Sequence, residues 1–120
     1  MRKVLIVEDN ELNVELLVQL LEDHFVLSVA ADGEQAVALA AKEHPDLILM
    51  DMSLPGVDGW TALRRLKSDP VLCRIPVISV SAHAMEGDEA KARAAGSDDY
   101  ITKPIDEVVL FRKLKVWLGS

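Results

Sequence analysis

Five short apolar runs alternate with five longer stretches whose apolar residues recur at helical spacing. The runs have the length of strands and are too short to be buried helices. They are Val4–Val7, Val26–Ala30, Leu47–Met50, Val77–Val80 and the brief Tyr100–Thr102. The helical stretches are approximately Glu11–Glu22, Glu34–Lys42, Trp60–Lys67, Asp88–Ala95 and Glu107–Leu118. Regular strand–helix alternation predicts an α/β fold built on one parallel sheet.

The first, third and fourth runs are almost continuously apolar, which is typical of parallel strands covered by helices on both faces. Right-handed crossovers place helices on both sides of such a sheet, so we expect a doubly wound (βα)5 domain. Asn10, Asp58 and Asp106 are expected to cap helix N-termini, and Gly96 to end the fourth helix. Asp32-Gly33 is expected to form a turn.

Size and charge narrow the class of protein. The chain has 120 residues, and we expect residues 1–120 to form one domain. A net charge of −7 argues against binding to nucleic acid or to anionic lipid. No apolar run approaches the length of a membrane span, and no signal-peptide core follows Met1. Cys73 is the only cysteine, which excludes an internal disulfide. A cytoplasmic protein is expected.

Polar residues follow the predicted strands at one edge of the sheet, where ligands bind in such folds. Glu8 and Asp9 follow the first strand, Asp51 the third, Ser81 the fourth and Lys103 the fifth. Two carboxylates about 4 Å apart repel by roughly 4 kcal/mol at an effective dielectric constant near 20. A cluster of three therefore needs a cation or a shared proton, and oxygen ligands favour Mg²⁺.

A carboxylate beside Mg²⁺, a lysine and a hydroxyl suits phosphoryl transfer to the carboxylate, and Asp51 ends the central, most apolar strand. Taken singly, Asp9 or Asp51 is as well explained by a helix cap or a turn. Lys103 alone is better explained as a surface lysine. The combination at separate strand ends favours a site.

Four segments, in order, resemble the receiver domains of two-component response regulators, the CheY-like family. They are Val4–Asn10, Asp46–Gly59, Ser81-Ala82 and Tyr100–Pro104. The resemblance implies a flavodoxin-like sheet with strand order 2-1-3-4-5 and a role in signal transduction. It implies a phosphoacceptor that assists its own phosphotransfer and autodephosphorylation and is not otherwise an enzyme. The phosphoryl donor would be a histidine kinase or a histidine phosphotransfer protein.

The resemblance also assigns residue roles. Asp51 would accept the phosphoryl group. Mg²⁺, for which Mn²⁺ can substitute, would be held by Asp9, by Asp51, by the backbone carbonyl of Ser53 and, through water, by Glu8.

Ser81 and Lys103 would contact the phosphoryl group, and Tyr100 would be the switch aromatic. The Lys103–Pro104 bond would be cis. Ser53 and His83 occupy positions that tune dephosphorylation, and neither is suited to positioning a water, so we expect slow hydrolysis.

Partner surfaces are expected on the first and last helices. Leu12, Val14 and Pro104 are the candidate docking residues for the phosphoryl donor. The core-facing residues of the first helix are expected to be Leu16, Leu17, Leu20 and Leu21. A downstream protein target would bind the fourth and last helices, and the chain is expected to be a monomer or a weak phosphorylation-dependent dimer.

Two alternatives stay open. One is a receiver domain excised from a hybrid histidine kinase or a larger regulator. An aspartyl-phosphate phosphohydrolase is less favoured, because that mechanism needs a second acid two residues after the nucleophile, where this chain has Ser53.

Overall fold

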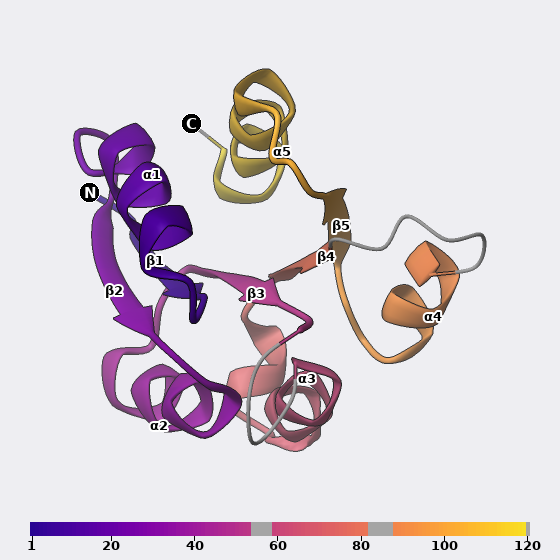
Figure 1. Ribbon diagram of the computed structural model, residues 1–120. Helices are drawn as coiled ribbons and strands as arrows, with labels where there is room; N and C mark the ends of the chain where they lie inside the picture. The colour runs from indigo at the N-terminus through magenta and orange to yellow at the C-terminus, as the bar shows by residue number, and fades with distance from the viewer. Residues whose placement is uncertain (54–58, 82–87, 120) are drawn as a thin grey trace.

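The computed structural model describes residues 1–53, 59–81 and 88–119, and structural statements concern these residues. They include a five-stranded parallel sheet of order β2-β1-β3-β4-β5, which confirms the predicted topology (Figure 1). The strands are β1 (Lys3–Val7), β2 (Val26–Ala30), β3 (Leu47–Asp51), β4 (Val77–Ser81) and β5 (Asp99–Thr102).

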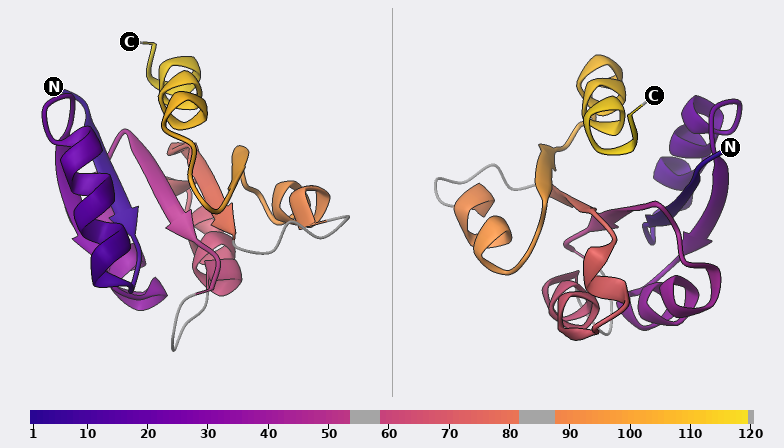
Figure 2. Two further views of the ribbon diagram at one scale, coloured as in Figure 1. Left: turned by 45° about the horizontal axis from the view of Figure 1, so that its top comes forward. Right: turned by 180° about the vertical axis from the view of Figure 1, so that it is seen from behind.

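Helices cover both faces of the sheet. α1 and α5 lie on one face, α2 and α3 lie on the other, and α4 lies beside β5 (Figure 1). The right-hand view of Figure 2 shows the same layers from behind. The helices are α1 (Glu11–Leu21), α2 (Gly33–Glu43), α3 (Gly59–Ser68), α4 (Asp88–Ala94) and α5 (Glu107–Leu118). A short 3₁₀ helix, Leu72–Arg74, precedes β4 and was not predicted.

The sheet separates two hydrophobic cores because side chains alternate along each strand. In β1, Leu5 and Val7 pack toward α2 and α3, whereas Val4 and Ile6 pack toward α1 and α5. β3 and β4 are buried along their whole lengths. This burial explains the nearly continuous apolar runs and fixes the strand ends rigidly.

Side-chain caps set several helix starts. Asn10 and Asp106 cap α1 and α5, as predicted. Asp32, expected only in a turn, caps α2 by accepting the Gln35 amide at 2.8 Å. Gly96 follows α4 with φ of 110°, a conformation that favours glycine. The predicted cap Asp58 lies outside the described residues.

One prediction for α1 is wrong. Leu17 and Leu21 are buried, Leu20 is half-buried, but Leu16 is 54% exposed. Only one face of α1 packs on the sheet, and Leu16 lies at the margin of that face, where it lines a surface groove. Within residues 1–53, 59–81 and 88–119, no helix is long and apolar enough to cross a membrane.

Candidate functional site

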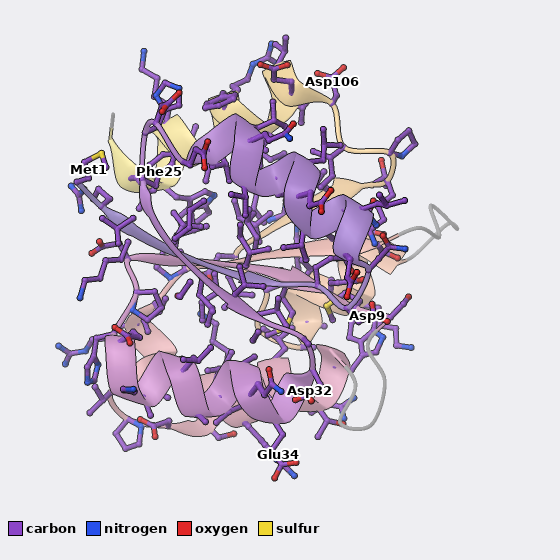
Figure 3. All side chains as sticks on the ribbon, turned by 60° about the vertical axis from the view of Figure 1, so that its left-hand side comes forward. Met1, Asp9, Phe25, Asp32, Glu34 and Asp106 are labelled. Carbon is purple, nitrogen blue, oxygen red and sulfur yellow. The ribbon has the colours of Figure 1, made fainter. Side chains whose placement is uncertain are left out.

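Three carboxylates meet at the carboxyl ends of β1 and β3. One oxygen each from Glu8, Asp9 and Asp51 lies within 4.8 Å of the others. Glu8 and Asp51 are each only 4% exposed, whereas Asp9 is open to solvent. Figure 3 shows Asp9 beside the start of α1, at the opposite end of the molecule from Met1 and Phe25. The sheet therefore collects these acids at one edge, as the spacing predicted.

Lys103, which follows β5, balances part of this negative charge. Its Nζ lies 3.0 Å from Glu8 Oε1 and 3.1 Å from Asp51 Oδ2. The backbone amide of Lys103 donates to the Ser81 carbonyl at 2.8 Å, which extends the β4–β5 pairing and directs the lysine side chain. The peptide bond between Lys103 and Pro104 is cis.

The pKa values of the two buried acids are shifted in opposite directions. Burial raises the pKa of Glu8, and the neighbouring Asp51 raises it further. Burial alone would raise the pKa of Asp51, but hydrogen bonds with Glu8, the Ser53 amide and Lys103 outweigh burial and lower it. The same pairing raises the pKa of Lys103 despite its burial. The bonds from Lys103 and the Ser53 amide therefore favour the ionised form of Asp51, the form in which it can act as a nucleophile.

The backbone around Asp51 fixes its position. The Ser53 amide donates to Asp51 Oδ1 at 2.9 Å, and the Met52 amide donates to the Val80 carbonyl at 2.9 Å. Gly59, the first residue of α3, packs directly on this segment. A Cβ there would lie 2.5 Å from Met52 Cα and 2.6 Å from the Asp51 carbonyl oxygen. Only glycine allows α3 to start so close to the end of β3.

Glu8 is held by three donors. Besides Lys103, the Asp9 amide donates to Oε2 at 3.1 Å, and Asn13 Nδ2 donates to Oε1 at 2.8 Å. Asn13 was not predicted as a site residue. Its position in the first turn of α1, three residues after the cap Asn10, was the available signal, because that turn faces the carboxyl ends of the strands.

The other predicted site residues have different surroundings. Ser81, at the end of β4, and Tyr100, in β5, are both 7% exposed. Ser53 is exposed on the loop that follows β3. His83 lies outside the described residues.

An apolar groove of about 390 Å³ opens beside the acidic site, between α1 and the segment that follows β5. Of the predicted docking residues, Pro104 lines it, whereas Leu12 (75% exposed) and the half-buried Val14 do not. The groove is lined by Glu8, Asn13, Leu16, Leu17, Leu20, Lys103, Pro104 and Ile105.

The donor set fits a hard divalent cation. Three carboxylates supply oxygen ligands, and Mg²⁺ is usually bound by one or two carboxylates together with water and phosphate. The solvent-exposed Asp9 leaves the site accessible to an ion from solution.

Comparison with known proteins agrees with this geometry. The family model for the response regulator receiver domain matches residues 4–115, and the chain belongs to that family. It therefore functions in two-component signal transduction. The family is one of phosphoacceptor signalling domains and not of classical enzymes.

Two curated relatives differ greatly in length. The polar-differentiation response regulator DivK of Brucella ovis is 44% identical over 120 residues, which cover 99% of this chain and 98% of DivK. The response regulator PleD of Caulobacter vibrioides is 42% identical over 114 residues. That match covers 94% of this chain, and the matched region is only 25% of PleD.

Solved structures share the fold along nearly the whole chain. The receiver domain of the sensor histidine kinase PA1611 from Pseudomonas aeruginosa is 37% identical, with a TM-score of 0.91 and coverage of 99% and 98% of the two chains. That structure has a magnesium ion coordinated in its active-site cleft. The receiver domain of Saccharomyces cerevisiae Ssk1, solved with the histidine phosphotransfer protein Ypd1, is 28% identical, with a TM-score of 0.88 and coverage of 97% and 88%.

Proposed function

We propose that Asp51 accepts a phosphoryl group from a phosphohistidine in a Mg²⁺-dependent reaction. The observation that carries this proposal is the buried Asp51 carboxylate, ion-paired to Lys103 at 3.1 Å within a cluster of three acids. A carboxylate oxygen of Asp51 attacks phosphorus. The O–P bond forms, the P–N bond breaks, and its electron pair returns to the imidazole ring. Because the other ring nitrogen of the phosphohistidine carries a proton, the products are an acyl phosphate and a neutral histidine.

The surrounding residues would divide the remaining work. Asp9, Asp51 and the Ser53 carbonyl would hold Mg²⁺ directly, with Glu8 acting through a water molecule. When bound, the ion would neutralise charge on the phosphoryl oxygens. Lys103 adds a second positive charge on the same group. If the Lys103 ammonium group moves from Glu8 to the phosphoryl group, Glu8 would then be held only by its other hydrogen-bond donors.

Ser81 and Tyr100 would transmit the effect of phosphorylation from the site to the protein surface. Ser81 would donate its hydroxyl to a phosphoryl oxygen, and Tyr100 would act as the switch aromatic. Both lie in the β4–β5 pair, next to α4 and α5, so a change at the phosphoryl group would reach the surface where a downstream protein would bind. The protein would be a monomer, or a weak dimer formed on phosphorylation.

We place the phosphoryl donor on the apolar groove beside the site. Pro104 lines the groove, and the exposed Leu16 supplies apolar surface at its rim. A helix of the donor lying there would bring its phosphohistidine to Asp51. The binding of the Ssk1 receiver domain to Ypd1 supports a histidine phosphotransfer protein or a histidine kinase as donor.

Residues 1–120 would act as one receiver domain in the cytoplasm, where a single unpaired cysteine stays reduced. An alternative is that the chain is one domain of a hybrid histidine kinase or a larger regulator. Two findings support this alternative: the similarity to the receiver domain of a sensor histidine kinase, and the much greater length of PleD.

A direct test is incubation with a small phosphodonor and Mg²⁺, followed by intact-mass measurement. The wild type should gain one phosphoryl group, and Asp51→Asn should gain none. Equal labelling of both proteins would exclude Asp51 as the acceptor.

A further inference from the structure

The geometry points to Asn13 as a positioning residue for the metal site, acting through Glu8; this inference rests on the proposed Mg²⁺-dependent function. Asn13 Nδ2 donates to Glu8 Oε1 at 2.8 Å. It is a neutral side-chain donor to this buried carboxylate and reaches it from α1, an element that carries none of the proposed ligands.

Glu8 needs such a donor because its other side-chain partner is charged. Lys103 Nζ lies 3.0 Å from the same oxygen, Oε1. A divalent cation among the three carboxylates places a second positive charge near Lys103, and like charges repel. The Lys103–Glu8 pair is therefore the contact that metal binding weakens. The Asn13 amide carries no net charge, so it can hold Glu8 in both states.

The length of the Glu8 side chain makes this contact matter more. Glutamate has one more rotatable bond than aspartate, so its carboxylate can occupy more positions. The Asp9 amide fixes Oε2 at 3.1 Å, and Asn13 fixes Oε1. With both oxygens held, the carboxylate keeps one orientation toward Asp9 and Asp51. Partners that orient metal ligands in this way typically change metal affinity by about 10–100-fold when they are removed.

The local structure allows the Asn13 side chain to be changed without disturbing α1. The cap Asn10 accepts from the backbone amide of Asn13, at 3.1 Å, and every substitution except proline keeps that amide. Asn13 is only half-buried and lies beside the leucines of the groove. Asn13→Leu therefore removes the donor, keeps the branched shape and adds a good helix former.

The test is Mg²⁺ titration of five proteins by calorimetry, with circular dichroism as a check on folding: the wild type, Asn13→Leu, Gln19→Leu, Glu8→Asp and the double variant that combines Glu8→Asp with Asn13→Leu. Asn13→Leu should bind Mg²⁺ about tenfold more weakly than the wild type. Gln19→Leu, the same amide-to-leucine change at an exposed position of α1, should match the wild type. In the Glu8→Asp background the shorter carboxylate withdraws from Asn13, so adding Asn13→Leu should change the dissociation constant by less than about twofold.

Each outcome bears on a different claim. Wild-type affinity in Asn13→Leu would overturn the positioning role, as would a full tenfold loss in the Glu8→Asp background. Absence of Mg²⁺ binding by the wild type would overturn the proposed metal site itself. If Asn13→Leu fails to fold, Asn13→Ala provides the same comparison, because it too lacks the donor.

Discussion

The Lys103 ammonium group lies 3.1 Å from Asp51 Oδ2, although the two residues are 52 positions apart in the sequence. The parallel sheet brings them together, because Asp51 ends β3 and Lys103 follows β5. The same ammonium group lies 3.0 Å from Glu8 Oε1, so one cation compensates two buried carboxylates. Lys103 therefore links the stability of the metal-free site to its reactivity.

Replacing Lys103 by methionine should strengthen Mg²⁺ binding but slow phosphoryl transfer. Lys103→Met removes a positive charge beside the metal site, so Mg²⁺ should bind more tightly than to the wild type. Phosphoryl uptake from a small phosphodonor should slow by about 100-fold, since a donor to the developing negative charge is lost. The measurements are calorimetric Mg²⁺ titration and the rate of phosphorylation.

Lys113→Met is the matched control for that experiment, because Lys113 pairs with Asp99 and not with the site acids. It should leave both quantities near the wild-type values. Weaker Mg²⁺ binding in Lys103→Met would contradict the placement of Lys103 beside the ion.

Magnesium should stabilise the folded protein, because it relieves repulsion among Glu8, Asp9 and Asp51. At ten times its dissociation constant, the ion should add about 1.4 kcal/mol to the free energy of unfolding. The melting temperature should then rise by about 3–6 °C. Thermal unfolding with Mg²⁺ and with a chelator measures this shift. An equal shift in Asp9→Asn would place the stabilising ion elsewhere.

The groove beside the site should control donor recognition and not the chemistry. Leu16→Asp introduces a charge into the groove, so phosphotransfer from a histidine phosphotransfer protein should slow by at least about tenfold, as for loss of an interface contact that contributes strongly to binding. Phosphorylation by a small phosphodonor should be unchanged. Val116→Asp, at a 70% exposed position of α5, is the control. Equal slowing with both donors would show that the substitution disturbs the acidic site.

Asp99 should make the fold sensitive to acid. Burial alone would raise the pKa of Asp99, but hydrogen bonds from Lys113, Trp117 and the Tyr100 amide lower it. A carboxyl group with a lower pKa in the folded than in the unfolded state stabilises the fold above its ordinary pKa of about 3.9. That stabilisation is lost as the pH falls through the lower, folded-state pKa.

Asp99→Asn should therefore lower the free energy of unfolding at pH 7 by about 1–3 kcal/mol, the cost of weakening bonds to a charged group. It should also reduce the loss of stability between pH 7 and pH 3. Urea unfolding at both values measures each effect, with the exposed Asp23→Asn as control. An unchanged pH dependence would mean that Asp99 does not couple folding to protons.

The phosphoryl group on Asp51 should be lost slowly. Ser53, two residues beyond the acceptor, uses its backbone amide to bind Asp51 Oδ1 and carries no carboxylate or amide side chain to orient a water molecule. Loss of the phosphoryl mass over time, in the presence of Mg²⁺, measures the lifetime. A lifetime of only seconds would contradict this expectation.

The apolar runs predicted the strands because the strands are buried, whereas the strand order was predicted only from the resemblance to receiver domains. The five strands agree with the predicted ranges to within one residue at each end. The acids at the ends of β1 and β3 were predictable for the same reason, since parallel strands end at one edge of the sheet. Helix boundaries set by a cap, such as Asp32 before α2, were less visible, because aspartate is equally common in turns.

Side-chain contacts between elements could not be predicted in the same way. Leu16 has the spacing of a core residue, but its exposure depends on where α1 sits at the edge of its face of the sheet. Asn13 reads as an ordinary helical residue, and its bond to Glu8 requires the angle between β1 and α1. The hydrogen bonds of Asp99 to Lys113 and Trp117 depend similarly on how α5 packs beside β5.

The central claim is that Glu8, Asp9, Asp51 and Lys103 form one site for a divalent cation and a phosphoryl group. The most direct test is a crystal structure of the protein with Mn²⁺ and beryllofluoride, using anomalous scattering to locate the metal. The claim predicts Mn²⁺ bound to the carboxylates of Asp9 and Asp51, with beryllofluoride on Asp51 and in contact with Lys103. A metal peak away from these carboxylates, or beryllofluoride absent from Asp51, would contradict it.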